Sequence, residues 1–269
     1  MHEQTLFEAA ILGILEGLTE FLPVSSTGHL ILFADLMRFA GPPGRVFEVV
    51  IQLGAILAVC VLYAPKLLRV AFGLPADRGA QRFALAILLA FLPAVALGVL
   101  LHDFIKSVLF SPYVVCWALI LGGVAILAVE RARPVPRIHA IERFSPGLSL
   151  GIGTMQCLAM VPGVSRSAAT ILGALLLGVE RRTAAEFSFF LAIPTMLGAA
   201  AYDLWANRAG LTADGGLVVA AGFLSAFLTA LLVVRWFIAF VGRRGFAPFA
   251  WYRILLGGGM LAVLLLQRG

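Results

Sequence analysis

The sequence has few charged residues and few cysteines, and it lacks the short motifs of several common enzyme classes. Only 13% of the 269 residues are charged and 61% are hydrophobic, against about 25% and about 45–50% in soluble domains. Together with a mean hydropathy of +1.02, this composition excludes an ordinary soluble domain and predicts an integral membrane protein. The sequence contains no Walker-type glycine loop, no HExxH and no CxxC, so it carries none of these nucleotide-site or metal-site signatures.

The three cysteines and the excess of basic residues also have simple structural explanations. Cys60, Cys116 and Cys157 are odd in number, widely separated and placed in apolar segments, so we interpret them as packing residues. The net charge of +6 is spread over loops, which favours membrane orientation over nucleic-acid binding as its cause. The first ten residues have no basic region and no small-residue cleavage site, so no signal peptide is expected.

Six segments are apolar and long enough to cross a bilayer core, which takes about 20 residues of helix. Two further apolar stretches, residues 5–40 and 145–179, are interrupted near the middle, at Pro23 and Pro162. Proline removes a backbone donor and disfavours helix at the preceding residue. Non-helical backbone persists at membrane depth only where protein or water satisfies it, so we predict two re-entrant helix hairpins. The six predicted spans are residues 46–64, 81–102, 112–130, 183–205, 216–240 and 249–267.

The two interrupted stretches resemble each other when the sequence is shifted by 140 residues, which aligns Ser25 with Ser165. The break falls at the same place in both, so we predict two repeats, about 1–130 and 131–269, within a single membrane domain. The expected fold class is an all-α polytopic membrane protein with six transmembrane helices, two re-entrant hairpins and an inverted-topology repeat.

Basic residues are distributed unevenly between the two sides of this arrangement, twelve against five. The positive-inside rule places the richer side in the cytoplasm and both termini outside. Complete crossing by each hairpin half would give the same distribution, so the charges predict orientation without deciding re-entrance. The richer set is Lys66, Arg69, Arg78, Arg82, Arg131, Arg133, Arg137, Arg143, Arg181, Arg182, Arg243 and Arg244, and the other is Arg38, Arg45, Lys106, Arg208 and Arg268.

Two carboxylates and three hydroxyl groups lie at the first break. Glu16 and Glu20 are four residues apart, which places both carboxylates on one face of a helix. This pair suits general acid–base work or a divalent cation, unless backbone or hydroxyl donors satisfy it. Ser25, Ser26 and Thr27 either cap the following helix or help its free N–H groups to bind an anion. Capping fits Ser25 and Thr27 better than Ser26.

His29 lies one turn after Ser26, where an imidazole can activate a hydroxyl or contact a bound phosphate. A lone histidine on an apolar helix is usually a packing residue. Here, however, two glutamates and a hydroxyl cluster lie in the same short stretch. We therefore include His29 among the catalytic candidates.

Arg166 lies at the second break, between Ser165 and Ser167. Arginine binds phosphate bidentately and stays charged when desolvated, so an anionic ligand is expected at this helix start. The alternative is an internal ion pair with Glu16 or Glu20. Thr170, one turn further on, either joins the phosphate site or donates to its own helix backbone.

Polar and aromatic residues near the ends of the other spans are assigned to the membrane interface. Arg235 and Arg253 are expected to extend to the interface or bind lipid headgroups. The tryptophans are expected to act as interfacial anchors; they are Trp117, Trp205, Trp236 and Trp251.

Residues 16–30 (EGLTEFLPVSSTGHL) and 162–170 (PGVSRSAAT) resemble the two signature regions of the bacterial undecaprenyl-diphosphatase family, also known as bacitracin-resistance proteins. The similarity extends over the whole chain, including FEVVIQLGAILAV at 47–59, and neither motif departs from the family pattern. The resemblance implies removal of the terminal phosphate of undecaprenyl diphosphate, the C55 carrier lipid, on the outer side of the bacterial inner membrane. It thereby implies roles in peptidoglycan synthesis, cell shape and bacitracin resistance.

The resemblance also implies a divalent cation, Mg²⁺ or Ca²⁺, for which Glu16 and Glu20 are the candidate ligands. It implies Glu20, Ser26, His29 and Arg166 as core catalytic residues. The candidate phosphate-binding residues are Ser25, Thr27, Ser165, Arg166, Ser167 and Thr170.

Two questions stay open from the sequence. The nucleophile is either Ser26, activated by His29 or Glu20, or water with His29 as the base. Broken helices in inverted repeats are also typical of secondary carriers, so a transporter of a lipid phosphate or another anion is the alternative to an enzyme. The expected partners are the lipid substrate and the bilayer, with no nucleic acid. A homodimer is compatible with the sequence, which does not fix the oligomeric state.

Overall fold

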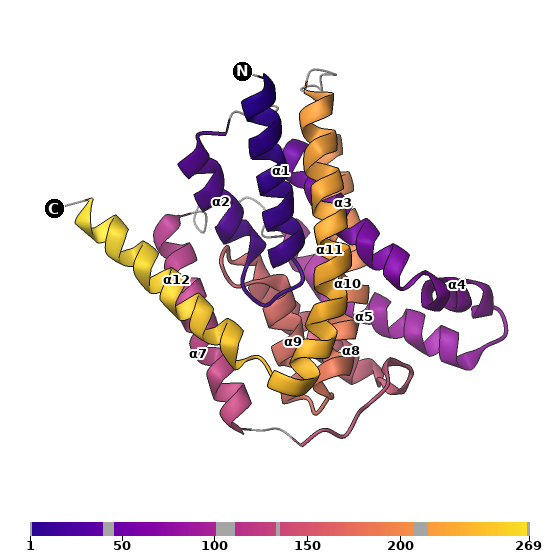
Figure 1. The fold of residues 1–269 in the computed structure, drawn as a ribbon. Helices are drawn as coiled ribbons and strands as arrows, with labels where there is room; N and C mark the ends of the chain where they lie inside the picture. Colours follow the sequence, from indigo (N-terminus) through magenta and orange to yellow (C-terminus); the bar gives the residue numbers. More distant parts are fainter. Residues whose placement is uncertain (1, 40–45, 101–110, 133–134, 207–214, 268–269) are drawn as a thin grey trace.

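The computed structural model describes residues 2–39, 46–100, 111–132, 135–206 and 215–267 (Figure 1). Within these ranges the regular structure is helical, apart from one isolated bridge between Ile138 and Val179. In chain order the helices are α1 (His2–Thr19), α2 (Ser26–Met37), α3 (Val46–Leu62), α4 (Ala64–Gly73), α5 (Arg78–Leu100), α7 (Pro112–Ala132), α8 (Pro146–Gln156), α9 (Arg166–Leu176), α10 (Arg181–Ala206), α11 (Gly216–Arg244) and α12 (Ala247–Leu266). Two 3₁₀ turns, η2 (Ile141–Arg143) and η3 (Cys157–Met160), flank α8.

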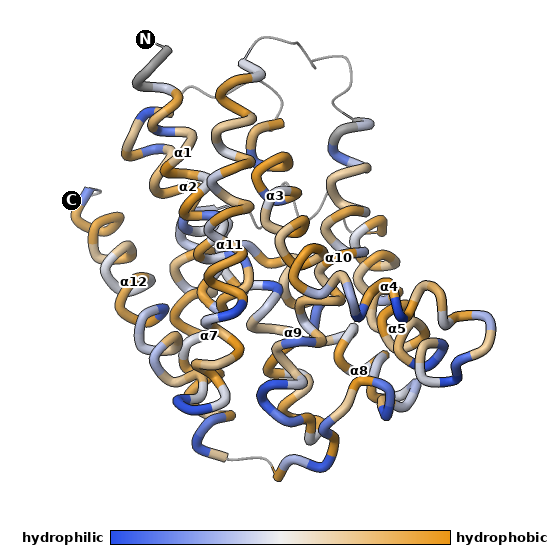
Figure 2. The backbone as a smooth tube through the Cα atoms, turned by 45° about the vertical axis from the view of Figure 1, so that its right-hand side comes forward, coloured by the Kyte–Doolittle hydropathy of each residue, from blue (hydrophilic) through white to orange (hydrophobic). Residues whose placement is uncertain are grey.

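Five helices of the described chain, α5, α7, α10, α11 and α12, are long and apolar enough to cross a membrane. The predicted span 46–64 is shorter than expected, because α3 ends at Leu62 and α4 turns away from it by 74°. Pro65 lies in the first turn of α4, where a missing N–H costs no helical hydrogen bond. Figure 2 shows apolar residues along most of each long helix. The prediction of an all-α polytopic membrane protein is confirmed.

Both predicted breaks are present. The first lies between Thr19 and Ser26, and the second lies between Met160 and Arg166. Ser25 and Ser165, the residues immediately before α2 and α9, have φ angles of 73° and 74°. This left-handed region is uncommon for residues other than glycine, and such strain is typical of functional segments.

Close helix contacts hold the breaks in the interior. Helix α1 packs against α11 and α2, whereas α8 packs against α5 and α9. Gly13 of α1 lies so close to the backbone of Gly222 in α11 that no side chain would fit, as is common where membrane helices touch. Helix α10 contacts α3, α5 and α9, and α7 pairs with α12 beside them (Figure 1). Phe21, which lies within the first break, packs edge-on against Phe189 of α10, with ring centroids 5.2 Å apart.

The three cysteines are free thiols, and Cys116 is fully buried. Cys60 packs against the main apolar core. These contacts agree with the packing role expected from the sequence. Positions 101 and 102 of the predicted span 81–102 lie outside the described residues. So do five of the basic loop residues used to predict orientation, which are Arg45, Lys106, Arg133, Arg208 and Arg268.

Candidate active site

A chain of hydrogen bonds joins the two breaks through Glu20. The Ser26 hydroxyl donates to Oε2 of Glu20 at 2.5 Å. On the other carboxylate oxygen, Nη2 of Arg166 donates to Oε1 at 3.0 Å. Glu20 is only 7% exposed, so this ion pair is shielded from solvent and its attraction is strong. The structure therefore brings together three of the four predicted catalytic residues, and it contains the Arg166–Glu20 pair that was the alternative to anion binding.

Arg166 is held by helix α10 as well as by Glu20. Its Nη1 donates to the Ser188 carbonyl at 2.7 Å and lies 3.3 Å from the Ser188 hydroxyl. Its Nε–H is buried and has no hydrogen-bond partner in the described part of the chain. One donor of the guanidinium is therefore available for an anionic ligand even while the ion pair with Glu20 is intact.

Two hydroxyl groups, those of Thr170 and Ser188, contact each other and Arg166. The two hydroxyl oxygens lie 2.7 Å apart, and Thr170 Oγ1 is 3.0 Å from the Arg166 carbonyl oxygen. The contact with its own helix is the structural alternative predicted for Thr170. Ser188 was not among the predicted site residues, because a single serine in an apolar helix has no local signal of function.

The serines around Arg166 tie the second break to the first. Ser167 donates to the Leu22 carbonyl at 2.7 Å, and its hydroxyl lies 3.0 Å from that of Ser165. Ser165 caps α9 by accepting from the Ala168 N–H at 3.2 Å. The side chain of Ser25, by contrast, makes no capping hydrogen bond to α2, so of the two alternatives for Ser25 the capping one is not seen. Thr27 is exposed.

Glu16 is fully buried, and neither of its carboxylate oxygens has a hydrogen-bond partner among the described residues. An unpaired buried carboxylate is costly, and a proton or a cation relieves that cost. Within the described ranges no group of three or more His, Cys, Asp or Glu residues could hold a metal ion. The unpaired oxygens of Glu16, with the neighbouring carboxylate of Glu20, match the one or two protein carboxylates that Mg²⁺ commonly takes, its shell being completed by substrate oxygens and water.

His29 is buried, and both of its ring nitrogens are within hydrogen-bond distance of partners other than Ser26. Nδ1 lies 2.7 Å from the Ser25 carbonyl oxygen, and Nε2 lies 2.5 Å from the hydroxyl of Tyr252. Because Glu20 accepts from Ser26, the geometry favours Glu20 over His29 as the group that activates this hydroxyl. Tyr252 lies in an apolar predicted span and had no sequence signal.

Arg253 corrects a sequence prediction, since it lies inside the protein and not at the membrane interface. It is 0% exposed and donates to five backbone carbonyls in the described chain. Three of these carbonyls lie at the breaks, where helical donors are missing, and the other two lie within α7; the five N–H groups of a guanidinium can bond to all of them. Gly122 leaves the space that this guanidinium occupies. The acceptors are Pro23 (3.1 Å), Ala118 (3.0 Å), Leu119 (3.3 Å), Gly163 (2.9 Å) and Val164 (2.9 Å).

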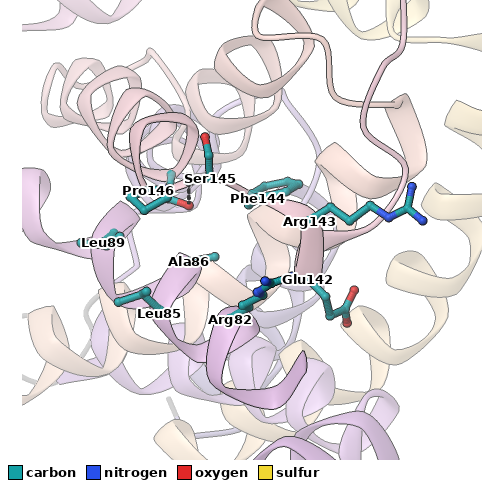
Figure 3. A pocket seen from close by; sticks show the side chains of 10 residues that line it. Arg82, Leu85, Ala86, Leu89, Glu142, Arg143, Phe144, Ser145 and Pro146 are labelled. Carbon is teal, nitrogen blue, oxygen red and sulfur yellow. Dashed lines mark hydrogen bonds between the residues drawn. The ribbon is translucent and has the colours of Figure 1, made fainter. Parts of the chain in front are cut away.

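A cavity of 330 Å³ lies elsewhere, between α5 and the start of α8 (Figure 3). Arg82, Leu85, Phe144 and Ser145 are among the residues that line it, and none of the predicted catalytic residues does. The candidate active site is therefore the buried cluster at the breaks and not this cavity.

The fold and this cluster define a class: an all-α polytopic membrane protein with a buried charged cluster between two helix breaks. A family model described as "Bacitracin resistance protein BacA" matches residues 9–259. Undecaprenyl-diphosphatase of Parvibaculum lavamentivorans is 58% identical over 97% of both chains. Undecaprenyl-diphosphatase 2 of Paramagnetospirillum magneticum is 57% identical over 98% of this chain and 100% of the relative. Undecaprenyl-diphosphatase 1 of Agrobacterium fabrum is 52% identical over 99% of this chain and 100% of the relative. The chain belongs to the BacA family, as the sequence motifs predicted.

Proposed function

We propose that this chain is a membrane phosphatase that hydrolyses undecaprenyl diphosphate to undecaprenyl phosphate and phosphate, recycling the carrier lipid for cell-wall synthesis. Relatives at 52–58% identity over nearly the whole chain are named undecaprenyl-diphosphatases. The observation that carries the proposal is the Arg166–Glu20–Ser26 chain. It supports the proposal because a guanidinium, a carboxylate and a hydroxyl are in contact beside the starts of two helices.

The first task of the site is to hold the diphosphate. Helices α2 and α9 begin at Ser26 and Arg166, and helix N-termini attract phosphate through free N–H groups and the helix dipole. The free Nε–H of Arg166 adds a charged donor. These groups would offset the charge that develops on the transferred phosphoryl group, which is the main requirement of phosphoryl transfer.

In the proposed reaction, Ser26 is the nucleophile and Glu20 the base. The Ser26 oxygen bonds to the terminal phosphorus while its proton passes to Oε2 of Glu20. The bridging P–O bond breaks and undecaprenyl phosphate leaves with the electron pair. Water then releases phosphate from Ser26, with His29 as the proton acceptor, and Ser26 regains its proton from Glu20. Direct attack by water with His29 as the base is the competing route.

Glu16 and Glu20 are the residues that would hold a divalent cation, Mg²⁺ or Ca²⁺. The unpaired carboxylate oxygens of Glu16 support this assignment. A cation bound there would supply positive charge to the diphosphate oxygens.

We also propose that the two halves of the chain are inverted repeats, with both termini and the active site facing the periplasm. The matching left-handed serines, Ser25 and Ser165, support the repeat. So does the exchange of partners between halves, because α1 packs on α11 of the second half and α8 packs on α5 of the first. Cysteine labelling of intact cells at Thr5 and Gln267 tests the orientation, since both positions would react with an impermeant reagent.

The decisive experiment measures phosphate release from C15 and C55 prenyl diphosphates by the purified protein in detergent. Wild type is expected to release phosphate, and Arg166→Ala is expected to be inactive. Arg235→Ala is the matched control, because Arg235 is an exposed arginine of α11. Full activity in Arg166→Ala would contradict the assignment. A wild-type protein that moves lipid phosphate across vesicles without hydrolysing it would be a carrier.

A further inference from the structure

Tyr252 contacts the one predicted catalytic residue that is not part of the Ser26–Glu20–Arg166 chain. Its hydroxyl oxygen lies 2.5 Å from Nε2 of His29. The two rings are nearly parallel, with an interplanar angle of 5° and centroids 5.5 Å apart. The contact joins residues that are 223 positions apart in the chain, on α2 and α12.

The other contact of the imidazole fixes the direction of this hydrogen bond. A carbonyl oxygen can only accept, so Nδ1 of His29 carries the proton that it donates to Ser25. When the imidazole is neutral it has this one proton only, so Nε2 then holds a lone pair and accepts from the Tyr252 hydroxyl. In this state Tyr252 occupies the lone pair of the reactive nitrogen and holds the ring turned toward α12.

The position of Tyr252 is itself fixed by its neighbour. Arg253 hydrogen-bonds to Pro23 at the first break and to Gly163 and Val164 at the second, so α12 is anchored to both breaks at this point. Tyr252 is 44% exposed, whereas His29 is 1% exposed. The partly exposed tyrosine thus lies between the buried Nε2 and the surface of the protein.

We propose that Tyr252 is a positioning residue for the second step of the reaction, acting through His29; this rests on the proposed covalent route through Ser26. Glu20 serves the first step, and Tyr252 holds His29 ready for the second. When the attacking water enters between them, the Tyr252 hydroxyl hydrogen-bonds to the water and holds it against Nε2. The water oxygen bonds to phosphorus, the bond from phosphorus to the Ser26 oxygen breaks, and the water proton passes to Nε2 of His29.

Tyr252→Phe tests whether Tyr252 acts only in the second step, because this substitution removes the hydroxyl and keeps the ring. Slower release of phosphate from Ser26 lowers kcat and KM together and leaves kcat/KM unchanged, since kcat/KM reports only the first step. We expect kcat to fall about tenfold, the usual effect of losing one hydrogen bond at a reacting group. Phosphorylated Ser26 should accumulate in the variant. Tyr63→Phe is the matched control, since Tyr63 lies at the α3–α4 junction against Phe190.

A double-mutant cycle separates action through His29 from a general structural effect. If Tyr252 acts through His29, Tyr252→Phe should cause no further loss in a His29→Gln background. Equal losses of kcat in both backgrounds, unchanged kinetics in the single variant, or a fall in kcat/KM would each overturn the proposal.

Chemical modification gives a readout that does not depend on turnover. Diethyl pyrocarbonate reacts with an unprotonated imidazole nitrogen, so His29 should be modified several-fold faster in Tyr252→Phe than in wild type, as quantified by peptide mass spectrometry. An unchanged rate would overturn the proposal. If the wild type forms no phosphoserine, the covalent route through Ser26 is wrong. The rate of His29 modification then still decides whether the Tyr252 hydroxyl holds Nε2 of His29.

Discussion

The Ser26 hydroxyl donates to the Glu20 carboxylate across the break that separates α1 from α2. Glu20 lies just beyond the end of one helix and Ser26 is the first residue of the next. The two residues belong to no common helix, so the irregular backbone between them sets the distance of 2.5 Å between Ser26 Oγ and Glu20 Oε2. Arg166 fixes the other oxygen of the same carboxylate from the second break. Proper alignment of the proposed nucleophile and base therefore depends on both breaks at once.

Replacing Ser26 by alanine should abolish turnover, because it removes the proposed nucleophile and leaves Glu20 with nothing to deprotonate. We expect a loss on the order of 10³-fold or more in kcat. Ser225→Ala, in which a half-buried serine of α11 is replaced, should retain activity. Rapid acid quenching followed by mass spectrometry should detect phosphate on Ser26 in the wild type. An active Ser26→Ala enzyme would show that water attacks directly.

Replacing Glu20 by glutamine should separate catalysis from folding. Glutamine keeps the size of the side chain and can still contact Arg166 and Ser26, but it cannot take the proton. Loss of a positioned general base typically costs about 10²–10⁴-fold in rate. Glu142→Gln is the control, since Glu142 is 39% exposed and pairs with Lys66 at 3.3 Å. Phosphate release and circular dichroism on the same samples check the prediction. Equal activity in the two variants would remove Glu20 from the mechanism.

The breaks and the central cluster could be predicted because their signals are local. Proline and clustered hydroxyl groups mark each break in the sequence itself. Charged residues at membrane depth are expected to find partners, which is why an ion pair of Arg166 with Glu16 or Glu20 could be considered from the sequence. The exact partner of each side chain could not be predicted, because it depends on how two distant segments meet.

Local sequence patterns do not predict long-range contacts, as three residues show: Arg253, Tyr252 and Ser188. Arg253 lies near the start of an apolar span, and by position alone it matches an interfacial arginine. Its acceptors lie up to 230 residues away in the chain. Ser188 and Tyr252 act on residues 22 and 223 positions away. Neither hydropathy nor motif spacing reports such contacts, since they arise only when the helices pack.

Removing divalent cations should stop the reaction, and adding Mg²⁺ or Ca²⁺ should restore it. If Glu16 is a ligand, Glu16→Gln should raise the metal concentration for half-maximal activity by about 10–100-fold, a range seen even when supporting groups of metal sites are removed. Calorimetric titration of Mg²⁺ into each protein measures the same shift without turnover. Glu142→Gln again serves as the control. Full activity of the wild type in excess chelator would instead mean that Glu16 is buried in its protonated form.

Replacing Arg253 by methionine should destabilise the protein, because it leaves three backbone carbonyls at the breaks without this donor and removes two further hydrogen bonds to carbonyls of α7. Loss of a buried charged donor network typically costs on the order of 3–5 kcal/mol in the free energy of unfolding. Arg253→Lys should fall between wild type and Arg253→Met, because an ammonium has three donors and cannot reach all five acceptors.

Thermal unfolding in detergent, followed by tryptophan fluorescence, measures this loss. Arg235→Met, at an exposed position of α11, should unfold close to the wild-type midpoint. An interfacial arginine would give the same small effect at both positions. Equal midpoints for the two variants would therefore restore the interfacial role that the sequence predicted for Arg253. A large drop confined to Arg253→Met, together with loss of phosphatase activity, is expected because the same guanidinium contacts Pro23 at one break and Gly163 at the other.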